Sequence, residues 1–64
     1  MDNETQGLIS YKEVERLTSL TRRTIHRRIE SGNFPKPIQI GPQRKAFVRG
    51  EVLDWIDDLI SKQR

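Results

Sequence analysis

The sequence predicts a mostly α-helical domain with a small β-hairpin, arranged as a winged helix-turn-helix with three helices and a two-stranded wing. Two short amphipathic segments, 11–17 and 22–31, are joined by a brief turn, which is typical of a helix-turn-helix. Two segments with strand character, 38–40 and 45–48, flank a Gly-Pro turn and predict the hairpin. A third helix is expected over 50–61, where apolar residues recur at helical spacing.

Length and composition limit how such a domain can be stabilised. A chain of 64 residues buries only about 60% of its unfolded surface. It has no cysteine for a disulfide or a thiolate metal site, so we expect a compact, locally connected helical core. The lack of cysteine fits a reducing cytoplasm, and no apolar run approaches the ~20 residues of a membrane span. Residues 1–7 are polar and are interpreted as a disordered leader, with the folded domain at 8–62.

The first helix is predicted from a capping box. Ser10 can accept a hydrogen bond from the backbone N–H of Glu13, and the Glu13 side chain can reach back to Ser10. Ile9 and Val14 stand on either side of the cap at the spacing of a hydrophobic staple. Val14 and Leu17 are therefore expected to face the core.

The second helix is predicted to begin after Thr21, which can cap it, and to end at Gly32 in the left-handed conformation. Ile25 and Ile29 are its only large apolar residues, and they lie four positions apart. The buried stripe of this helix is therefore narrow, and most of its surface is left to polar side chains.

The segment after the second helix cannot be helical, because Pro35 and Pro37 each remove a backbone donor and favour extended neighbours. The hairpin that follows turns at Gly41, which places Arg44 and Lys45 near its tip. The third helix carries its apolar residues at helical spacing, namely Val52, Trp55, Ile56, Leu59 and Ile60.

Charge is distributed unevenly along the chain. Residues 22–49 carry eight Lys and Arg against Glu30 alone, a net charge of +7, whereas 1–21 and 50–64 each carry −2. A basic middle between acidic ends is what a polyanionic partner would select. The alternative is a solvated charged face with no partner, and the local structure has to decide between them.

The second helix carries the strongest indication of that partner. On a helical wheel Arg23 and Arg27 lie opposite the two isoleucines, with Thr24 and His26 flanking them, and Arg22 in the first turn can swing outward. Arginine can bond bidentately to guanine in the DNA major groove, which a helix enters with its N-terminal turns. Arginines in the first turn also oppose the helix dipole, at a cost of ~0.3–1 kcal/mol each, and such local violations are expected at functional sites.

We therefore predict a nucleic-acid interface on the second helix and the wing. The N-terminal amides of the second helix, together with its capping residue, favour a phosphate. The wing cations are expected to contact phosphates rather than bases. The predicted DNA-binding residues are Thr21, Arg22, Arg23, Thr24, His26, Arg27, Arg44, Lys45 and Arg49.

Other chemistries find little support. His26 lacks the Cys, His or paired carboxylate partners that a metal site or a general base requires, so no metal, cofactor or catalytic residue is predicted. Trp55 and Phe47 are interpreted as core residues rather than a stacking platform for single strands. The aspartates of the third helix form a solvated face rather than a calcium loop. An enzyme is disfavoured, because no nucleophile–base constellation exists.

Three motifs also carry a family resemblance: Thr21–Ile29 (Thr-Arg-Arg-Thr-Ile-His-Arg-Arg-Ile), then Gly32 with Phe34–Pro37 (Phe-Pro-Lys-Pro), and Glu51-Val52 followed by Asp54–Ile56 (Asp-Trp-Ile). Through them, residues 8–56 resemble the AlpA-like prophage regulators, relatives of the excisionases within the MerR-like winged-helix group. The resemblance implies a regulator of transcription, of excision or of both, with its second helix in the major groove and its wing against the backbone. The positions that match the family's recognition helix are Arg22, Arg23, Thr24, His26 and Arg27.

The sequence departs from that family at three places. His26 stands where the family often has Tyr, and Phe47-Val48 replaces the usual Trp-Arg after the wing. Gly50 occupies a position where a helix-capping Ser is common. The second departure removes one expected phosphate contact, and the sequence leaves open whether Arg49 supplies it instead.

Several functions remain open at this point. The first is a sequence-specific transcriptional regulator of double-stranded DNA, working with RNA polymerase. The second is an excisionase-type cofactor that bends DNA and positions a recombinase (integrase), and the third is a basic protein-interaction module. MerR-type dimers use a long C-terminal coiled coil, but here the chain ends soon after Ile60, so we expect a monomer in solution that assembles on DNA.

Overall fold

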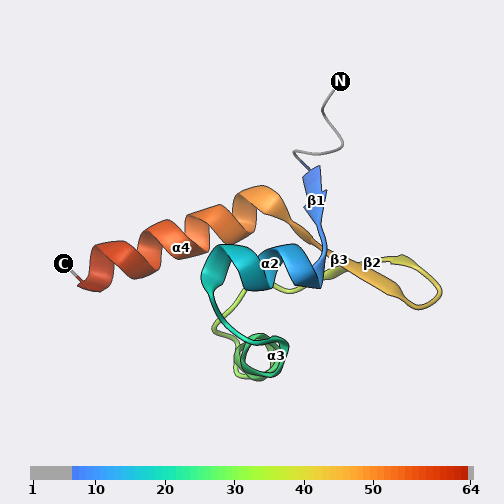
Figure 1. Ribbon diagram of the computed structural model, residues 1–64, viewed down its shortest axis with the longest axis horizontal. Coiled ribbons are helices and arrows are strands. Elements are labelled where there is room, and N and C mark those ends of the chain that lie inside the picture. The colour runs from blue at the N-terminus through green and yellow to red at the C-terminus, as the bar shows by residue number, and fades with distance from the viewer. Residues whose placement is uncertain (1–6, 64) are drawn as a thin grey trace.

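The computed structural model describes residues 7–63 and has the winged helix-turn-helix fold that the sequence predicts (Figure 1). Helix α2 lies across the middle of the molecule, α3 is seen end-on beneath it, and α4 and the wing extend to opposite sides. Apart from Gly7, the predicted disordered leader lies outside the described residues. In chain order the elements are β1 (Leu8–Ile9), α2 (Tyr11–Thr18), α3 (Arg22–Glu30), β2 (Ile38–Gly41), β3 (Arg44–Val48) and α4 (Arg49–Gln63).

The wing belongs to a small antiparallel sheet in the order β1-β3-β2. Strands β2 and β3 form the predicted hairpin, with a register irregularity at its turn. Strand β1 was not predicted. It pairs Ile9 with Phe47 and therefore joins the N-terminal side of the domain to the strand that leads into α4. Paired residues of an antiparallel sheet point to the same face, so Ile9 and Phe47 together enter the core.

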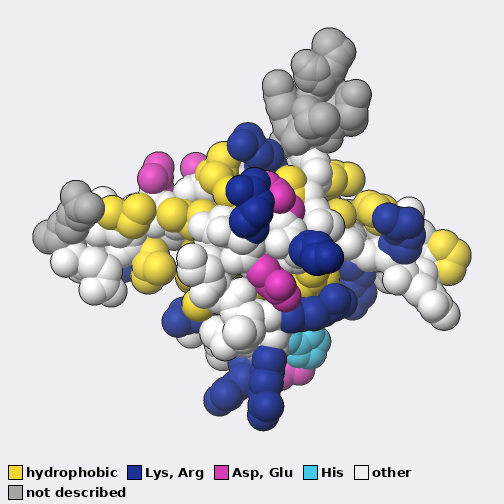
Figure 2. Space-filling model, in the orientation of Figure 1, with side chains coloured by type: hydrophobic (Ala, Val, Ile, Leu, Met, Phe, Trp, Pro, Cys, Tyr) yellow, Lys and Arg dark blue, Asp and Glu magenta, His cyan; other side chains and the backbone are white. Residues whose placement is uncertain are grey.

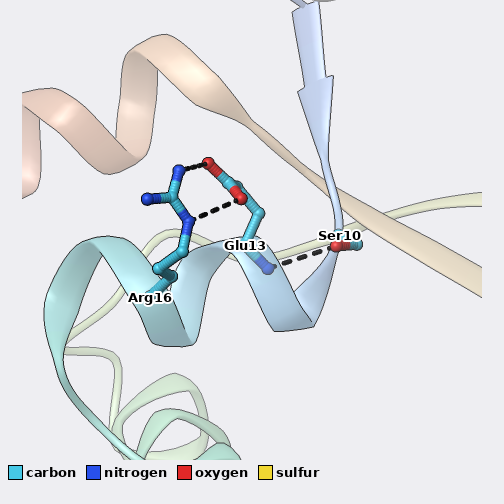
Figure 3. Close-up of polar contacts among 3 residues, drawn as sticks. All are labelled: Ser10, Glu13 and Arg16. Carbon is cyan, nitrogen blue, oxygen red and sulfur yellow. Dashed lines mark hydrogen bonds and ion pairs between the residues drawn. The ribbon is translucent and has the colours of Figure 1, made fainter.

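Helix α2 begins at the predicted cap, where the Glu13 N–H donates to Ser10 Oγ at 3.2 Å. The second half of the predicted capping box is wrong. The Glu13 carboxylate turns away from Ser10 and accepts hydrogen bonds from Arg16, at 3.2 Å from Nε and 2.6 Å from Nη2 (Figure 3). A charged, bidentate donor one turn along the helix competes better for a carboxylate than a neutral amide does. The helix ends at Ser19, which has a left-handed φ of 62°.

This ion pair makes a pH-dependent contribution to stability. The hydrogen bond from Arg16 holds the pKa of Glu13 below its ordinary value of 4.5, against a smaller opposing effect of burial. Since the pKa is lower in the folded state, the stabilisation is complete above about pH 4.5 and is lost as the pH falls through the folded value. We expect wild type to melt above Glu13→Gln at pH 7 and this gap to narrow at pH 3. Equal gaps in thermal melts at the two pH values would contradict the prediction.

Helix α3 has the predicted capping residue at each end. The Thr24 N–H donates to Thr21 Oγ1 at 3.2 Å, which caps the first turn. At the other end Gly32 has a φ of 82° and its N–H donates to the Ile29 carbonyl. The next N–H, of Asn33, donates back to Arg28 O at 2.8 Å, which completes a Schellman motif. The helix is one residue shorter than predicted, because the glycine conformation ends it at once.

The core lies between the helices and the inner face of the sheet. Phe47 is fully buried at its centre, with the Tyr11 ring at 4.9 Å and the Phe34 ring at 5.8 Å between centroids, both edge-on. Trp55 is half-buried against Phe34, and its Nε1–H donates to the Asn33 carbonyl at 2.8 Å. The buried apolar residues are Ile9, Val14, Ile25, Phe34, Ala46, Phe47 and Val52.

Two outcomes differ in detail from the sequence prediction. Phe34 lies in the Phe-Pro-Lys-Pro segment, for which the sequence predicted only extended structure, but it packs into the core against the rings of Phe47 and Trp55. Helix α4 is longer than predicted, and its last apolar residues, Leu59 and Ile60, lie beyond the body of the domain and are exposed. Among residues 7–63, no helix combines the length and the apolar character that a membrane crossing requires.

Candidate nucleic-acid interface

The outer face of α3 carries the arginines that the sequence assigned to it. Ile25 is fully buried and fixes the inward direction of the helix. Arg23 and Arg27, on the opposite side, are exposed, as is His26 beside them. Figure 2 shows Lys and Arg side chains gathered around α3, at the lower end of the molecule. The helix is therefore held by its narrow apolar stripe and presents cations to the outside.

Arg22 lies elsewhere than expected. Its guanidinium does not turn to the outer face but lies over the ring of Tyr11, with Cζ at 4.2 Å from the ring centroid. This geometry is a cation–π contact between the first residue of α3 and the first residue of α2. Arg22 therefore separates from Arg23 and Arg27 and belongs to the side of α3 that faces α2.

A groove of about 580 Å³ lies beside α3 on that side. Its walls come from the start of α2, from α3 and from the wing. Arg22 and His26 of α3 line this groove together with Arg44 and Lys45 of the wing, and Lys12 adds a cation that the sequence did not assign. The lining residues are Ser10, Tyr11, Lys12, Arg22, His26, Gln39, Pro42, Gln43, Arg44 and Lys45.

The sheet geometry explains how the wing reaches the groove. Lys45 pairs with Gln39 and stands two residues before the buried Phe47, so all three side chains share the inner face of the sheet. The Gln39 amide donates to the carbonyls of Gly41 and Pro42 at 3.1 and 3.2 Å, which ties the turn of the hairpin together. Lys45 is thus held toward α3 by the same alternation that buries Phe47, whereas Arg44 lines the groove from the turn end of β3.

The remaining predicted residues lie outside the groove. Thr21 caps α3, and its hydroxyl also donates to the Thr24 hydroxyl at 3.0 Å. Arg49, the first residue of α4, is exposed and close enough to Glu13 for its charge to help lower the pKa of that carboxyl. The structure therefore brings together four of the nine predicted residues in the groove, sets Arg23 and Arg27 on the adjacent outer face, and leaves Arg49 nearer to α2.

Acidic groups near the interface are few. The Glu30 carboxylate lies 3.7 Å from His26 Nδ1, one turn apart on the exposed side of α3. Within the described part of the chain, no three His, Cys, Asp or Glu side chains come together as a metal-binding cluster. The chemistry that this surface offers is the recognition of anions by arginine, lysine and backbone amides.

An exposed basic helix in a winged helix-turn-helix defines the class of small DNA-binding regulators. The family model described as "Prophage CP4-57 regulatory protein (AlpA)" matches residues 7–60, which is most of the chain. The protein belongs to this AlpA family of DNA-binding prophage regulators. Comparisons with curated proteins and with solved structures gave no match.

Proposed function

We propose that this protein is a sequence-specific regulator of transcription in a prophage or other mobile element, with α3 in the major groove of double-stranded DNA. The observation that carries the proposal is the exposed pair Arg23 and Arg27 opposite the buried Ile25. Neither arginine packs the domain, and both extend from a helix whose orientation the core fixes. A helix presented in this way can bring guanidinium groups to base edges, where they discriminate guanine from other bases.

The neighbouring groups supply the contacts that hold such a helix in register. The amides of Arg22 and Arg23 precede the first hydrogen bond within α3, so they can donate to a phosphate at the helix N-terminus. The wing cations Arg44 and Lys45 line the groove opposite α3. The DNA-contacting set that we propose is Thr21, Arg22, Arg23, Thr24, His26, Arg27, Arg44, Lys45 and Arg49, with residues 8–62 as the DNA-binding domain.

The experiment that tests this function is selection of bound duplexes from a random pool with the whole chain. A regulator of this kind should enrich one motif reproducibly. Binding without a preferred motif would instead favour a basic protein-interaction module for which DNA is incidental. A promoter reporter run beside an excision assay then separates regulation of transcription from DNA bending for a recombinase.

The wing gives a quantitative prediction. Because Arg44 and Lys45 are exposed cations on the hairpin, we expect them to bind phosphates rather than bases. Replacing both with Ala should weaken binding about equally on the selected site and on random duplexes. The plot of log K against log [salt] should become shallower by roughly 0.9 for each phosphate that is no longer neutralised. An unchanged slope would mean that the wing does not lie on the backbone.

Assembly is the remaining part of the proposal. We expect a monomer at micromolar concentration that forms higher assemblies only on DNA carrying repeated or inverted half-sites. The described elements offer no long coiled-coil helix, since α4, the longest of them, has 15 residues and packs its first turns into the core. Light scattering that found a stable dimer at low micromolar concentration without DNA would contradict this expectation.

A further inference from the structure

The Tyr11 ring stands between the core and the cationic groove. One side of it meets the fully buried Phe47 edge-on, with centroids 4.9 Å apart and planes at 88°. The guanidinium of Arg22 lies over its face at 4.2 Å. Phe47 holds the Tyr11 ring in place, because Phe47 itself cannot move without disturbing the core. The ring therefore offers Arg22 a rigid surface, although Tyr11 and Arg22 belong to different helices.

The surroundings make this surface useful for an anion. The groove that Tyr11 and Arg22 line also carries Lys12 and the wing cations. The carboxylate closest along α2, that of Glu13, is already bonded to Arg16, and neither of these two residues lines the groove. Arg22 is thus directed into the cationic groove between α2, α3 and the wing. It points away from the outer face where Arg23 and Arg27 lie.

A stacked arginine has a particular advantage in binding phosphate. An unrestrained Arg side chain loses rotamer freedom when it binds, whereas one already lying on an aromatic face has less to lose. A guanidinium has five N–H donors, so its contact with a ring leaves donors free for phosphate oxygens. The contact with Tyr11 is therefore compatible with a phosphate contact at the same time.

We propose that Tyr11 is a positioning residue of the DNA interface, whose ring holds the Arg22 guanidinium in the groove for a backbone phosphate of the bound duplex. This inference rests on the proposed function. It assigns Arg22 to the backbone, apart from the base-reading pair, and adds a residue of α2 to the recognition apparatus. The hydroxyl of Tyr11 has no part in it, so phenylalanine serves equally well at this position.

The test is a double-mutant cycle on duplex binding, with folding followed by circular dichroism. Tyr11→Leu keeps apolar bulk but removes the aromatic face, and it should weaken binding about 2- to 5-fold. Tyr11→Phe should bind as wild type does. In an Arg22→Gln background, Tyr11→Leu should have almost no further effect, because the side chain that it positions is gone. Arg22→Gln should also make the salt slope shallower by roughly 0.9.

Lys12→Gln is the matched control, since Lys12 lines the same groove from the same helix. Tyr11→Leu and Lys12→Gln should be additive. Additivity with Arg22→Gln as well, or an unchanged salt slope for Arg22→Gln, would overturn the positioning role while leaving the proposed function intact.

A measurement without DNA covers the case in which Tyr11→Leu fails to fold. In the wild-type protein the Arg22 Hδ protons should resonate upfield of those of Arg23 and Arg27, because the Arg22 side chain ends over the Tyr11 ring, and the same shift should persist in Tyr11→Phe. An Arg22 signal at the ordinary position would overturn the proposal. A wild-type protein that shows the upfield shift but binds no duplex would overturn the proposed function and this role together.

Discussion

Replacing Phe47 with Ala is expected to lower the melting temperature of the domain by about 10 °C or more. The side chain is fully buried and contacts the rings of Tyr11 and Phe34, so its removal leaves a cavity where three elements meet. Truncations of this kind cost about 3–5 kcal/mol. A domain of this length has a total stability of roughly 3–10 kcal/mol, so a large part of that stability would be lost.

Thermal melts followed by far-ultraviolet circular dichroism measure this effect. Ile60→Ala is the control, because Ile60 is 45% exposed near the end of α4, where Ala is also a good helix former. We expect the control to melt within a few degrees of wild type. A Phe47→Ala variant with a cooperative transition close to that of wild type would show that the core does not depend on this ring.

Phe47 also illustrates which parts of the fold could not be predicted from the sequence. Caps such as Ser10, Thr21 and Gly32 act within a few residues of chain, and each of them begins or ends a helix as predicted. Strand β1 has only two residues, so it carries no alternation to recognise, and it exists because Phe47 and Val48 of β3, distant in sequence, pair with it. Tertiary pairing of this kind has no local signal.

The candidate site likewise has residues whose positions the sequence predicts and residues whose positions depend on tertiary packing. The outward direction of Arg23 and Arg27 follows from helical periodicity relative to Ile25, which the sequence displays. The position of Arg22 depends on Tyr11 of another helix, and the position of Lys12 depends on how that helix meets the wing. The only sequence signal for the contact between Arg22 and Tyr11 was an aromatic residue at the first position of α2. That signal can be interpreted only once the packing of α2 against α3 is known.

The identity of the base-reading residues is the prediction that matters most for function. Arg23 and Arg27 are exposed and pack against nothing in the core, so Arg23→Ala and Arg27→Ala should both fold. Arg23→Ala should even gain slightly in helix stability, because a cation in the first turn opposes the helix dipole. If an arginine bonds bidentately to guanine, its removal should cost ~1–3 kcal/mol on the selected site and relax the preference at one base position.

Selection from a random pool with wild type and each variant measures both effects at once. Arg16→Ala is the control, because Arg16 is an exposed arginine bonded to Glu13 on α2, and its removal should leave the motif unchanged. An arginine that binds only a phosphate would, when removed, lower affinity uniformly across sequences and leave the motif intact, whereas removal of a base-reading arginine changes the motif itself. Should both folded variants keep the wild-type motif, α3 would be only an electrostatic anchor, and the specificity would have to come from DNA shape or from a partner protein.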